Sequence, residues 1–257
     1  MEQARPAEIT WAIEQAEAGR HFSMEQMADL IGRMMEGRLA EPDMARLLTA
    51  LHRKGETCTE LAGAALAMRR YMSPIRHRYS VLVDVVGTGG DGSGTFNIST
   101  AAALVTAAAG VPVAKHGNRR ATSRTGSADV LAALGVNIEA DLACVERCLA
   151  EVGICFCFAP LCHRAMQYVA PVRRQLPHPT IFNLLGPLAN PAGACYQLIG
   201  VGRAELRPRL AEAVALLGTA RTLVVHGAEG LDEVSLSGLT WVSEITGHQQ
   251  VQEYCWR

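Results

Sequence analysis

The chain has 257 residues, of which 49% are hydrophobic, and a formal net charge of −1 at pH 7. A chain of this size and apolarity can bury a substantial core, as one large domain or two unequal ones. The near-neutral charge argues against nucleic acid or a membrane surface as the main partner. The longest small-apolar stretch, residues 101–114, is interrupted by Gly110 and Pro112 and is too short to span a bilayer. The charged first residues contain no apolar run typical of a secretory signal, so we expect a cytoplasmic protein.

The N-terminal third of the chain has the pattern of a helical bundle. Residues 23–26 (Ser-Met-Glu-Gln) and 57–60 (Thr-Cys-Thr-Glu) predict capping boxes at the starts of two amphipathic helices. Another helix is expected to begin at Pro42 and to end near Gly55. Residues 162–176 are expected to form a further, inserted helix.

From about residue 74 the pattern changes to alternating strands and helices. Such alternation predicts a largely parallel sheet, with ligand sites beyond the C-terminal ends of the strands. The predicted fold class is therefore α/β, with a small all-helical N-terminal domain and a larger domain whose mainly parallel sheet is flanked by helices. Strands are expected at 81–86, 111–114, 154–158, 197–201 and 222–225, and helices at 101–109, 128–134, 142–151 and 205–217.

The first expected strand ends in a glycine-rich loop, Gly87-Thr-Gly-Gly-Asp91, and a helix follows from Asn97. Glycines let backbone N–H groups approach a ligand closely, and a helix N-terminus adds N–H donors and a partial positive charge. The loop lacks the Gly-Lys-Ser/Thr ending of a P-loop and the spacing of a dinucleotide fingerprint. We favour an anion site over a ligand-free turn, with Asp91 binding ribose hydroxyls or acting through a divalent cation.

The next expected strand leads into a basic loop that contains Lys115, His116, Arg119, Arg120 and Arg124. Lys and Arg donate charge-assisted hydrogen bonds to phosphate, and nearby hydroxyl groups can occupy the remaining oxygen positions. We favour a second phosphate site over a solvated basic loop. The hydroxyl groups belong to Thr122, Ser123, Thr125 and Ser127.

Five motifs stand out along the chain: Gly87-Thr-Gly-Gly-Asp91, Asn97-Ile-Ser-Thr100, Lys115-His-Gly-Asn-Arg119, Thr180-Ile-Phe-Asn-Leu-Leu-Gly-Pro-Leu188 and Gly230-Leu-Asp-Glu-Val-Ser235. In these motifs and in their order the chain resembles the anthranilate phosphoribosyltransferase family. The resemblance extends from the N-terminal helices to about residue 245. It implies a homodimer that uses Mg²⁺ and transfers the phosphoribosyl group of phosphoribosyl pyrophosphate (PRPP) to the amine of anthranilate, releasing pyrophosphate, in tryptophan biosynthesis.

The resemblance also implies how the chain divides. Residues 1–73 are expected to form the helical domain, and the inserted segment 162–178 to pack on it. Residues 74–161 and 179–257 are expected to form the phosphoribosyl-binding α/β domain. Family members continue beyond the end of this sequence, so we expect a C-terminally incomplete α/β domain, with the apolar residues of 239–245 unusually exposed.

The PRPP site implied by the resemblance combines the glycine-rich loop, the start of the following helix and the basic loop. Its residues are Gly87, Gly90, Asp91, Thr95, Asn97, Ile98, Ser99, Thr100, Lys115, His116, Gly117, Asn118, Arg119, Arg120, Ala121, Thr122, Ser123 and Ser127.

For anthranilate, the resemblance implies contacts from Gly87, Asn118, His163 and Arg173. A planar guanidinium group can hold the carboxylate through two hydrogen bonds. Arg174 is interpreted as a charge on the surface of the helix and not as a contact to anthranilate. The turn at 186–191 walls this pocket or is a plain connecting loop.

The implied Mg²⁺ ligands are Ser99, Asp232 and Glu233. An adjacent Asp-Glu pair alone usually marks a solvated loop, so this assignment depends on the resemblance. The amine attacks C1 of the ribose as pyrophosphate departs. Positioning and stabilisation of charge suffice for such a reaction, so no residue is predicted to act as a covalent nucleophile.

The sequence also departs from the family's pattern at single positions. Arg164 stands where the family commonly has proline, at the edge of the aromatic pocket, and Thr122 and Thr125 replace serines.

Two rival functions remain. One is a pyrimidine-nucleoside phosphorylase, which shares the architecture. The other is a non-catalytic paralogue that binds nucleic acid or a protein. The acidic pair and the retained glycine-rich loop favour the transferase.

Cys155 and Cys157 are interpreted as buried strand thiols and not as metal ligands.

Overall fold

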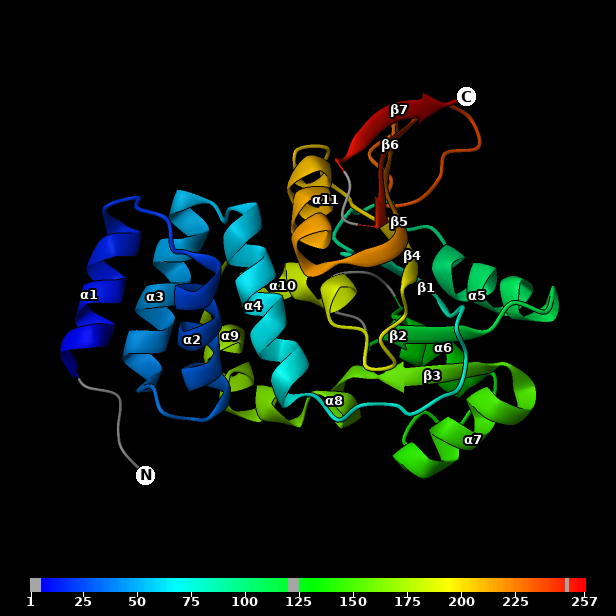
Figure 1. The fold of residues 1–257 in the computed structure, drawn as a ribbon, viewed down its shortest axis with the longest axis horizontal. Coiled ribbons are helices and arrows are strands. Elements are labelled where there is room, and N and C mark those ends of the chain that lie inside the picture. Colours follow the sequence, from blue (N-terminus) through cyan, green and yellow to red (C-terminus); the bar gives the residue numbers. More distant parts are fainter. Residues whose placement is uncertain (1–5, 120–124, 248–249) are drawn as a thin grey trace. The chain divides into compact units, whose positions relative to one another are not determined.

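The computed structural model describes residues 6–119, 125–247 and 250–257 (Figure 1). Within them the chain forms two compact units, one of residues up to 72 together with 163–189, the other of 73–162 together with 190–257. No helix in the described ranges is long and apolar enough to cross a membrane.

The first unit is helical. The helix α2 packs on α4, and α1 packs on α3. Both expected capping boxes are confirmed, because the hydroxyls of Ser23 and Thr57 accept the backbone N–H of the residue three positions later. The helices are α1 (Pro6–Glu17), α2 (Met24–Met35), α3 (Glu41–Lys54), α4 (Cys58–Tyr71), η1 (Arg164–Tyr168), α9 (Ala170–Gln175), α10 (Phe182–Leu185) and η2 (Gly186–Leu188).

The inserted segment differs from the single helix that the sequence suggested. It consists of the 3₁₀ helix η1 and the short α-helix α9, which meet at Val169. Pro171 explains the break, because proline has no N–H to donate to the carbonyl four residues earlier and is tolerated in the first turn of a helix, where it stands in α9.

Residues 179–189 also group differently from the expected division. They belong to the helical unit, whereas the sequence analysis assigned them to the α/β domain. The helix α10 contacts α4. Arg69 Nε, from α4, donates a hydrogen bond of 2.8 Å to the carbonyl of Leu188. These contacts tie the segment to the bundle.

The second unit contains one sheet with the strand order β3-β2-β1-β4-β5-β6-β7. The neighbouring strands β3, β2, β1, β4 and β5 are parallel, as expected. The strand β6 pairs antiparallel with β5, and β7 pairs antiparallel with β6; neither was predicted. The strands are β1 (Val83–Gly87), β2 (Val113–Gly117), β3 (Ile154–Phe158), β4 (Tyr196–Gly200), β5 (Thr219–Gly227), β6 (Thr240–Gly247) and β7 (Gln252–Trp256). The helices are α5 (Ile98–Ala108), α6 (Ser127–Ala133), α7 (Leu142–Val152), α8 (Ala159–Cys162) and α11 (Leu206–Leu217).

Side chains in two strands test the expected burial. Cys155 and Cys157 are buried on β3, which confirms their interpretation as core thiols. The expected exposure of residues 239–245 is wrong for Val242 and Ile245, which are fully buried, because α11 packs against β5 and β6. Trp241 is 38% exposed and stacks on His226.

Candidate functional site

The candidate site lies where the order of the sheet changes direction. The chain runs from β1 to β2 and β3 on one side of β1, and β4 then lies on its other side (Figure 1). Gly87 and Gly200, the last residues of β1 and β4, are opposite each other in register. Ligands of open α/β sheets bind beyond the C-terminal strand ends at such a switch point.

The loop between β5 and β6 crosses these two strand ends. A Cβ atom on Gly200 would lie 1.6 Å from the carbonyl oxygen of Asp232, and one on Gly87 would lie 2.9 Å from Asp232 Oδ2. Asp232 Oδ2 also accepts the N–H of Gly89 at 3.1 Å. The acidic loop therefore reaches the glycine-rich loop because two strands end in residues without side chains.

Gly200 and Gly202 were missed in the sequence analysis. A Cβ atom on Gly202 would lie 2.9 Å from the backbone of Asp91, so this glycine admits the glycine-rich loop just as Gly200 admits the acidic loop. The available signal was the Gly-Val-Gly sequence at the end of an expected strand.

The carboxyl groups of Asp91, Asp232 and Glu233 lie close together at these strand ends, and their negative charges repel one another. Burial, and then the charge of Asp91, raises the pKa of Asp232 to about 6. Burial, and then the charge of Asp232, raises the pKa of Glu233 to about 7, although Lys115 and the N–H of Ser99 oppose this shift. Oδ2 of Asp91 is buried and has no hydrogen-bond donor among the described residues. The cluster therefore carries more negative charge than its surroundings neutralise.

The first turn of α5 meets the acidic loop and β2. Ser99 N donates to Glu233 Oε1 at 3.1 Å, and Lys115 Nζ donates to Ser99 Oγ at 3.1 Å and to the Val85 carbonyl at 2.7 Å. Lys115 is only 3% exposed, and burial lowers its pKa. Residues that are far apart in the sequence thus form one connected polar cluster.

The cluster fits a divalent cation that is coordinated partly by the protein and partly by a substrate. In the described ranges no group of three His, Cys, Asp or Glu residues is close enough to hold a metal by itself. Mg²⁺ usually takes one or two carboxylates and fills its other positions with substrate phosphates and water. Such a cation would give the unsatisfied oxygen of Asp91 a partner and would favour the ionised forms of Asp232 and Glu233, whose pKa values are raised.

The glycine-rich loop and the basic loop are joined by Asn97, whose Nδ2 donates to Thr125 Oγ1 at 2.7 Å. Gly89 and Gly90 have positive φ angles, a conformation that exposes backbone N–H groups and favours glycine. The other predicted residues of this segment, Thr95, Ile98 and Thr100, belong to the same loop or to the first turn of α5.

The basic loop is described only in part. His116 and Gly117 end β2, Asn118 and Arg119 follow it, and Ser127 begins α6. The predicted residues Arg120, Ala121, Thr122 and Ser123, and the neighbouring Arg124, lie outside the described residues.

Arg119 is engaged within its own unit. Its guanidinium group approaches Asp129 at 3.5 Å and Glu139 at 3.2 Å, and it lies 5.7 Å from the centre of the Phe158 ring. In this arrangement Arg119 faces carboxylates, and it would have to exchange them for phosphate to fill its predicted role.

The residues predicted for anthranilate belong to both units. His163 and Arg173 are in the first unit, and Gly87 and Asn118 are in the second. Arg173 Nη2 donates to Asn183 Oδ1 at 3.1 Å, and its guanidinium lies 5.5 Å from the centre of the Phe182 ring. Burial lowers the pKa of Arg173, so this charge is held partly out of water.

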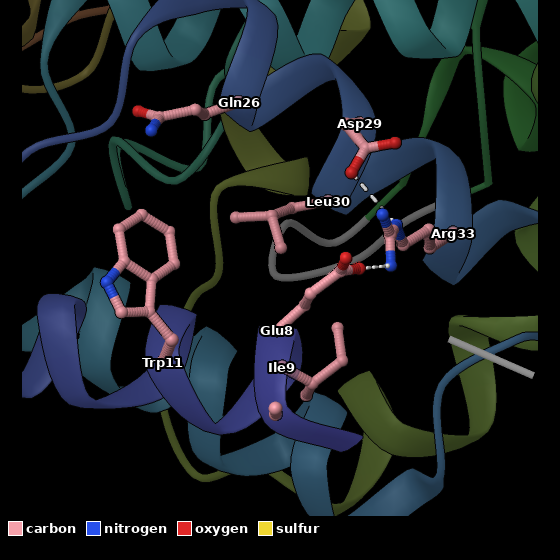
Figure 2. Close-up of a pocket in the computed structure, with 8 residues that line it drawn as sticks. Glu8, Ile9, Trp11, Gln26, Asp29, Leu30 and Arg33 are labelled. Carbon is pink, nitrogen blue, oxygen red and sulfur yellow. Dashed lines mark hydrogen bonds and ion pairs between the residues drawn. The ribbon is translucent and has the colours of Figure 1, made fainter. Parts of the chain in front are cut away.

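A surface pocket of about 350 Å³ in the first unit contains none of the predicted residues (Figure 2). It lies between α1 and α2, and Trp11 is 45% exposed at its side. Figure 2 shows Arg33 bridging Glu8 and Asp29, at 2.7 and 2.8 Å. Its one cation is already paired twice, so this pocket lacks the phosphate-binding chemistry found at the sheet.

The comparisons with known proteins agree with the fold. Residues 79–257 match the a/b domain of the glycosyl transferase family, and residues 6–72 match its helical bundle domain. An anthranilate phosphoribosyltransferase of Rhodopirellula baltica is 53% identical over 95% of this chain and 71% of its own length. These matches define the class of the protein as a two-domain glycosyl transferase.

Solved structures narrow the class to one family. The anthranilate phosphoribosyltransferase of Thermus thermophilus matches with a TM-score of 0.88 and 46% identity, over 95% of this chain and 72% of that one. The Saccharomyces cerevisiae enzyme in complex with PRPP and Mg matches with a TM-score of 0.88 and 28% identity, over 98% and 73%. The chain belongs to the anthranilate phosphoribosyltransferase family, which confirms the resemblance carried by the five motifs.

The close approach at Gly200 yields a first prediction. Gly200→Ala should push the acidic loop away and weaken Mg²⁺-dependent pyrophosphate binding by about tenfold or more, the equivalent of ~1.4 kcal/mol. Isothermal titration calorimetry measures this change. Gly238→Ala is the matched control in the same loop, because its Cβ would meet only ordinary contacts at 3.4 Å or more. Equal affinities for both variants would contradict the proposed packing.

The raised pKa values yield a second prediction. Between about pH 4.5 and pH 7 the folded protein holds protons on Asp232 and Glu233 that the unfolded chain releases, so without a metal these groups stabilise the fold less as pH rises. A bound cation reverses this, because it requires the ionised carboxylates. The rise in melting temperature caused by millimolar Mg²⁺ should therefore be larger near pH 8 than near pH 6. The same rise at both pH values would argue against a metal at this pair.

Proposed function

We propose that the chain transfers the phosphoribosyl group of PRPP to the amine of anthranilate and releases pyrophosphate, as a step of tryptophan biosynthesis. The observation that carries this proposal is the convergence of the glycine-rich loop, buried Lys115 and the Asp232-Glu233 pair at the ends of β1 and β4. Its support from comparison is the family membership and the similarity to the yeast enzyme bound to PRPP and Mg.

The phosphate-binding part of the proposal rests on donors already in place. Backbone N–H groups of the glycine-rich loop and the start of α5 provide uncharged donors to a pyrophosphate. Lys115 adds a positive charge that is held by the Val85 carbonyl and Ser99 Oγ. Because an ammonium group has three protons, one donor remains for a phosphate oxygen.

Ser99, Asp232 and Glu233 would hold the Mg²⁺ ion. When bound, the ion would neutralise charge on the departing pyrophosphate. The carboxylates themselves make the site negative, which attracts a cation. The N–H of Ser99 orients Glu233. Asp91 stands beside Asp232 and either reinforces the cation site or binds ribose hydroxyls.

The aromatic substrate requires positioning and no covalent catalysis. We assign its carboxylate to the guanidinium of Arg173, which Asn183 and Phe182 hold in place. Gly87, Asn118 and His163 are the further predicted contacts. The amine then attacks C1 of the ribose while positive charge develops on the sugar, and the fixed charges around the pyrophosphate stabilise its departure. A homodimer and a cytoplasmic location stay predictions.

An assay of pyrophosphate release with anthranilate, PRPP and Mg²⁺ tests the function. The pair Asp232→Asn with Glu233→Gln should abolish the Mg²⁺ dependence and lower kcat/KM for PRPP by at least about a hundredfold, because it removes both carboxylate ligands. Glu212→Gln, on the exposed side of α11, is the control. Activity with thymidine and phosphate in place of anthranilate and PRPP would instead support the nucleoside phosphorylase, and an unchanged double variant would refute the metal assignment.

Replacing Arg173 separates the two substrates. Arg173→Ala removes the proposed carboxylate contact, worth about 1.5–3 kcal/mol, and should raise KM for anthranilate about 10- to 150-fold. KM for PRPP should change little. Arg174→Ala is a matched control, because the neighbouring side chain is exposed. If Arg173→Ala impaired both substrates equally, the residue would have a structural role.

A further inference from the structure

The sheet has a local gap beside the phosphate site, between β1 and β2. The strands β1 and β4 are paired from Val83 to Gly87, and β2 and β3 are paired from Val113 to Gly117. In the described sheet, β1 and β2 are paired at one position, Val83 opposite Val113. Beyond that position the regular hydrogen bonds between the two strands give way to other partners.

Three side chains replace the missing bonds. Asp84 Oδ1 accepts the N–H of His116 at 3.1 Å, and Lys115 Nζ donates to the Val85 carbonyl at 2.7 Å. Asn190 Nδ2 donates to the Ala114 carbonyl at 2.9 Å. Because buried backbone groups need partners, these bonds make the separation of β1 and β2 stable.

Asp84 and Asn190 also bind each other. Asn190 Nδ2 donates to Asp84 Oδ2 at 2.8 Å, and Asn190 Oδ1 accepts the N–H groups of Ala192 at 2.9 Å and Ala194 at 3.4 Å. Asp84 is fully buried and Asn190 is 5% exposed. The amide is thus saturated with hydrogen bonds and fixes the carboxylate that spans the two strands.

Lys115 depends on this arrangement. Its stem leaves β2 between the two residues that Asn190 and Asp84 bind, and its ammonium reaches across the gap to β1 and on to Ser99. In a regular parallel ladder the Val85 carbonyl would accept a backbone N–H of β2 and would not be available to the ammonium. The gap therefore creates the acceptor that holds Lys115.

We propose that Asp84 and Asn190 are positioning residues for the phosphoribosyl transfer: they hold β1 and β2 apart so that Lys115 points its ammonium at Ser99 and the pyrophosphate. This inference rests on the proposed function. Neither residue needs to touch the substrate, because their effect passes through Lys115.

The test is a double-mutant cycle on pyrophosphate binding in the presence of Mg²⁺, measured by calorimetry well below the melting temperature. Asp84→Asn sets an amide donor against that of Asn190 and should weaken binding roughly tenfold, and Lys115→Met should weaken it at least as much. The variant with both changes should be no weaker than Lys115→Met alone, since the first residue acts through the second. Ser243→Ala, which removes a buried hydroxyl on β6, is the control for lost stability and should bind normally.

Each outcome decides a different question. Binding by Asp84→Asn within twofold of the parent chain, or additive losses in the double variant, would overturn the positioning role while leaving the proposed function intact. Failure of the parent chain itself to bind pyrophosphate would refute the proposed function, and the inference with it. If Asp84→Asn does not fold, Asn190→Ala replaces it in the cycle.

Hydrogen exchange on the parent chain provides a test that needs no variant. Pyrophosphate with Mg²⁺ should slow exchange in residues 113–117, because a ligand held by Lys115 stabilises the strand across the gap. Residues 219–223 of β5, at the opposite end of a strand from the site, are the internal reference. Equal protection changes in both segments would overturn the inference.

Discussion

The burial of one ammonium group, that of Lys115, constrains most of the second unit. A charge that is 3% exposed needs hydrogen-bond acceptors and opposite charge nearby. The Val85 carbonyl and Ser99 Oγ supply acceptors, and the electrostatic partners are Asp84 on one side and Glu233 on the other. The open β1–β2 gap, the first turn of α5 and the loop after β5 are thereby linked to a single side chain. The same burial that makes Lys115 costly to hold makes it a strong partner for a phosphate.

The carboxyl groups of the cluster outnumber the described cations that could neutralise them. Asp232 and Glu233 are brought to the strand ends by glycines at 87 and 200, and no described cation neutralises both of them together with Asp91. Among its described residues the site has one fixed cation, Lys115, and three carboxyl groups. It is therefore less suited to pyrophosphate alone or to a metal ion alone than to both. It suits the two together, because a metal ion would coordinate the carboxylates while the phosphate oxygens would accept hydrogen bonds from Lys115 and the backbone N–H groups.

Sequence patterns predicted the features that depend on near neighbours. The capping residues Ser23 and Thr57 bind within one helical turn, and the parallel strands follow from their own apolar runs. The break between η1 and α9 was not predicted, although its cause is local, since the missing N–H of Pro171 accounts for it. By contrast, the contact between Gly200 and Asp232, or between Asp84 and Asn190, joins residues that only the folded sheet brings together. The motifs marked the loops of the site, but the residues that position those loops carried no motif of their own.

The distribution of the candidate residues separates two kinds of recognition. Every described residue assigned to PRPP lies in the second unit, on the ends of strands, the first turns of helices and the loops that join them. Two of the four residues assigned to anthranilate, Arg173 and His163, lie in the first unit, on a segment that forms two short helices. Arg164, at the family's proline position, is exposed on that same segment. A change there alters surface charge and helix geometry near the aromatic contacts without touching Lys115 or the acidic pair. A substitution in this segment can therefore change contacts proposed for anthranilate while it leaves the phosphate-binding cluster unchanged, because that cluster lies in the second unit.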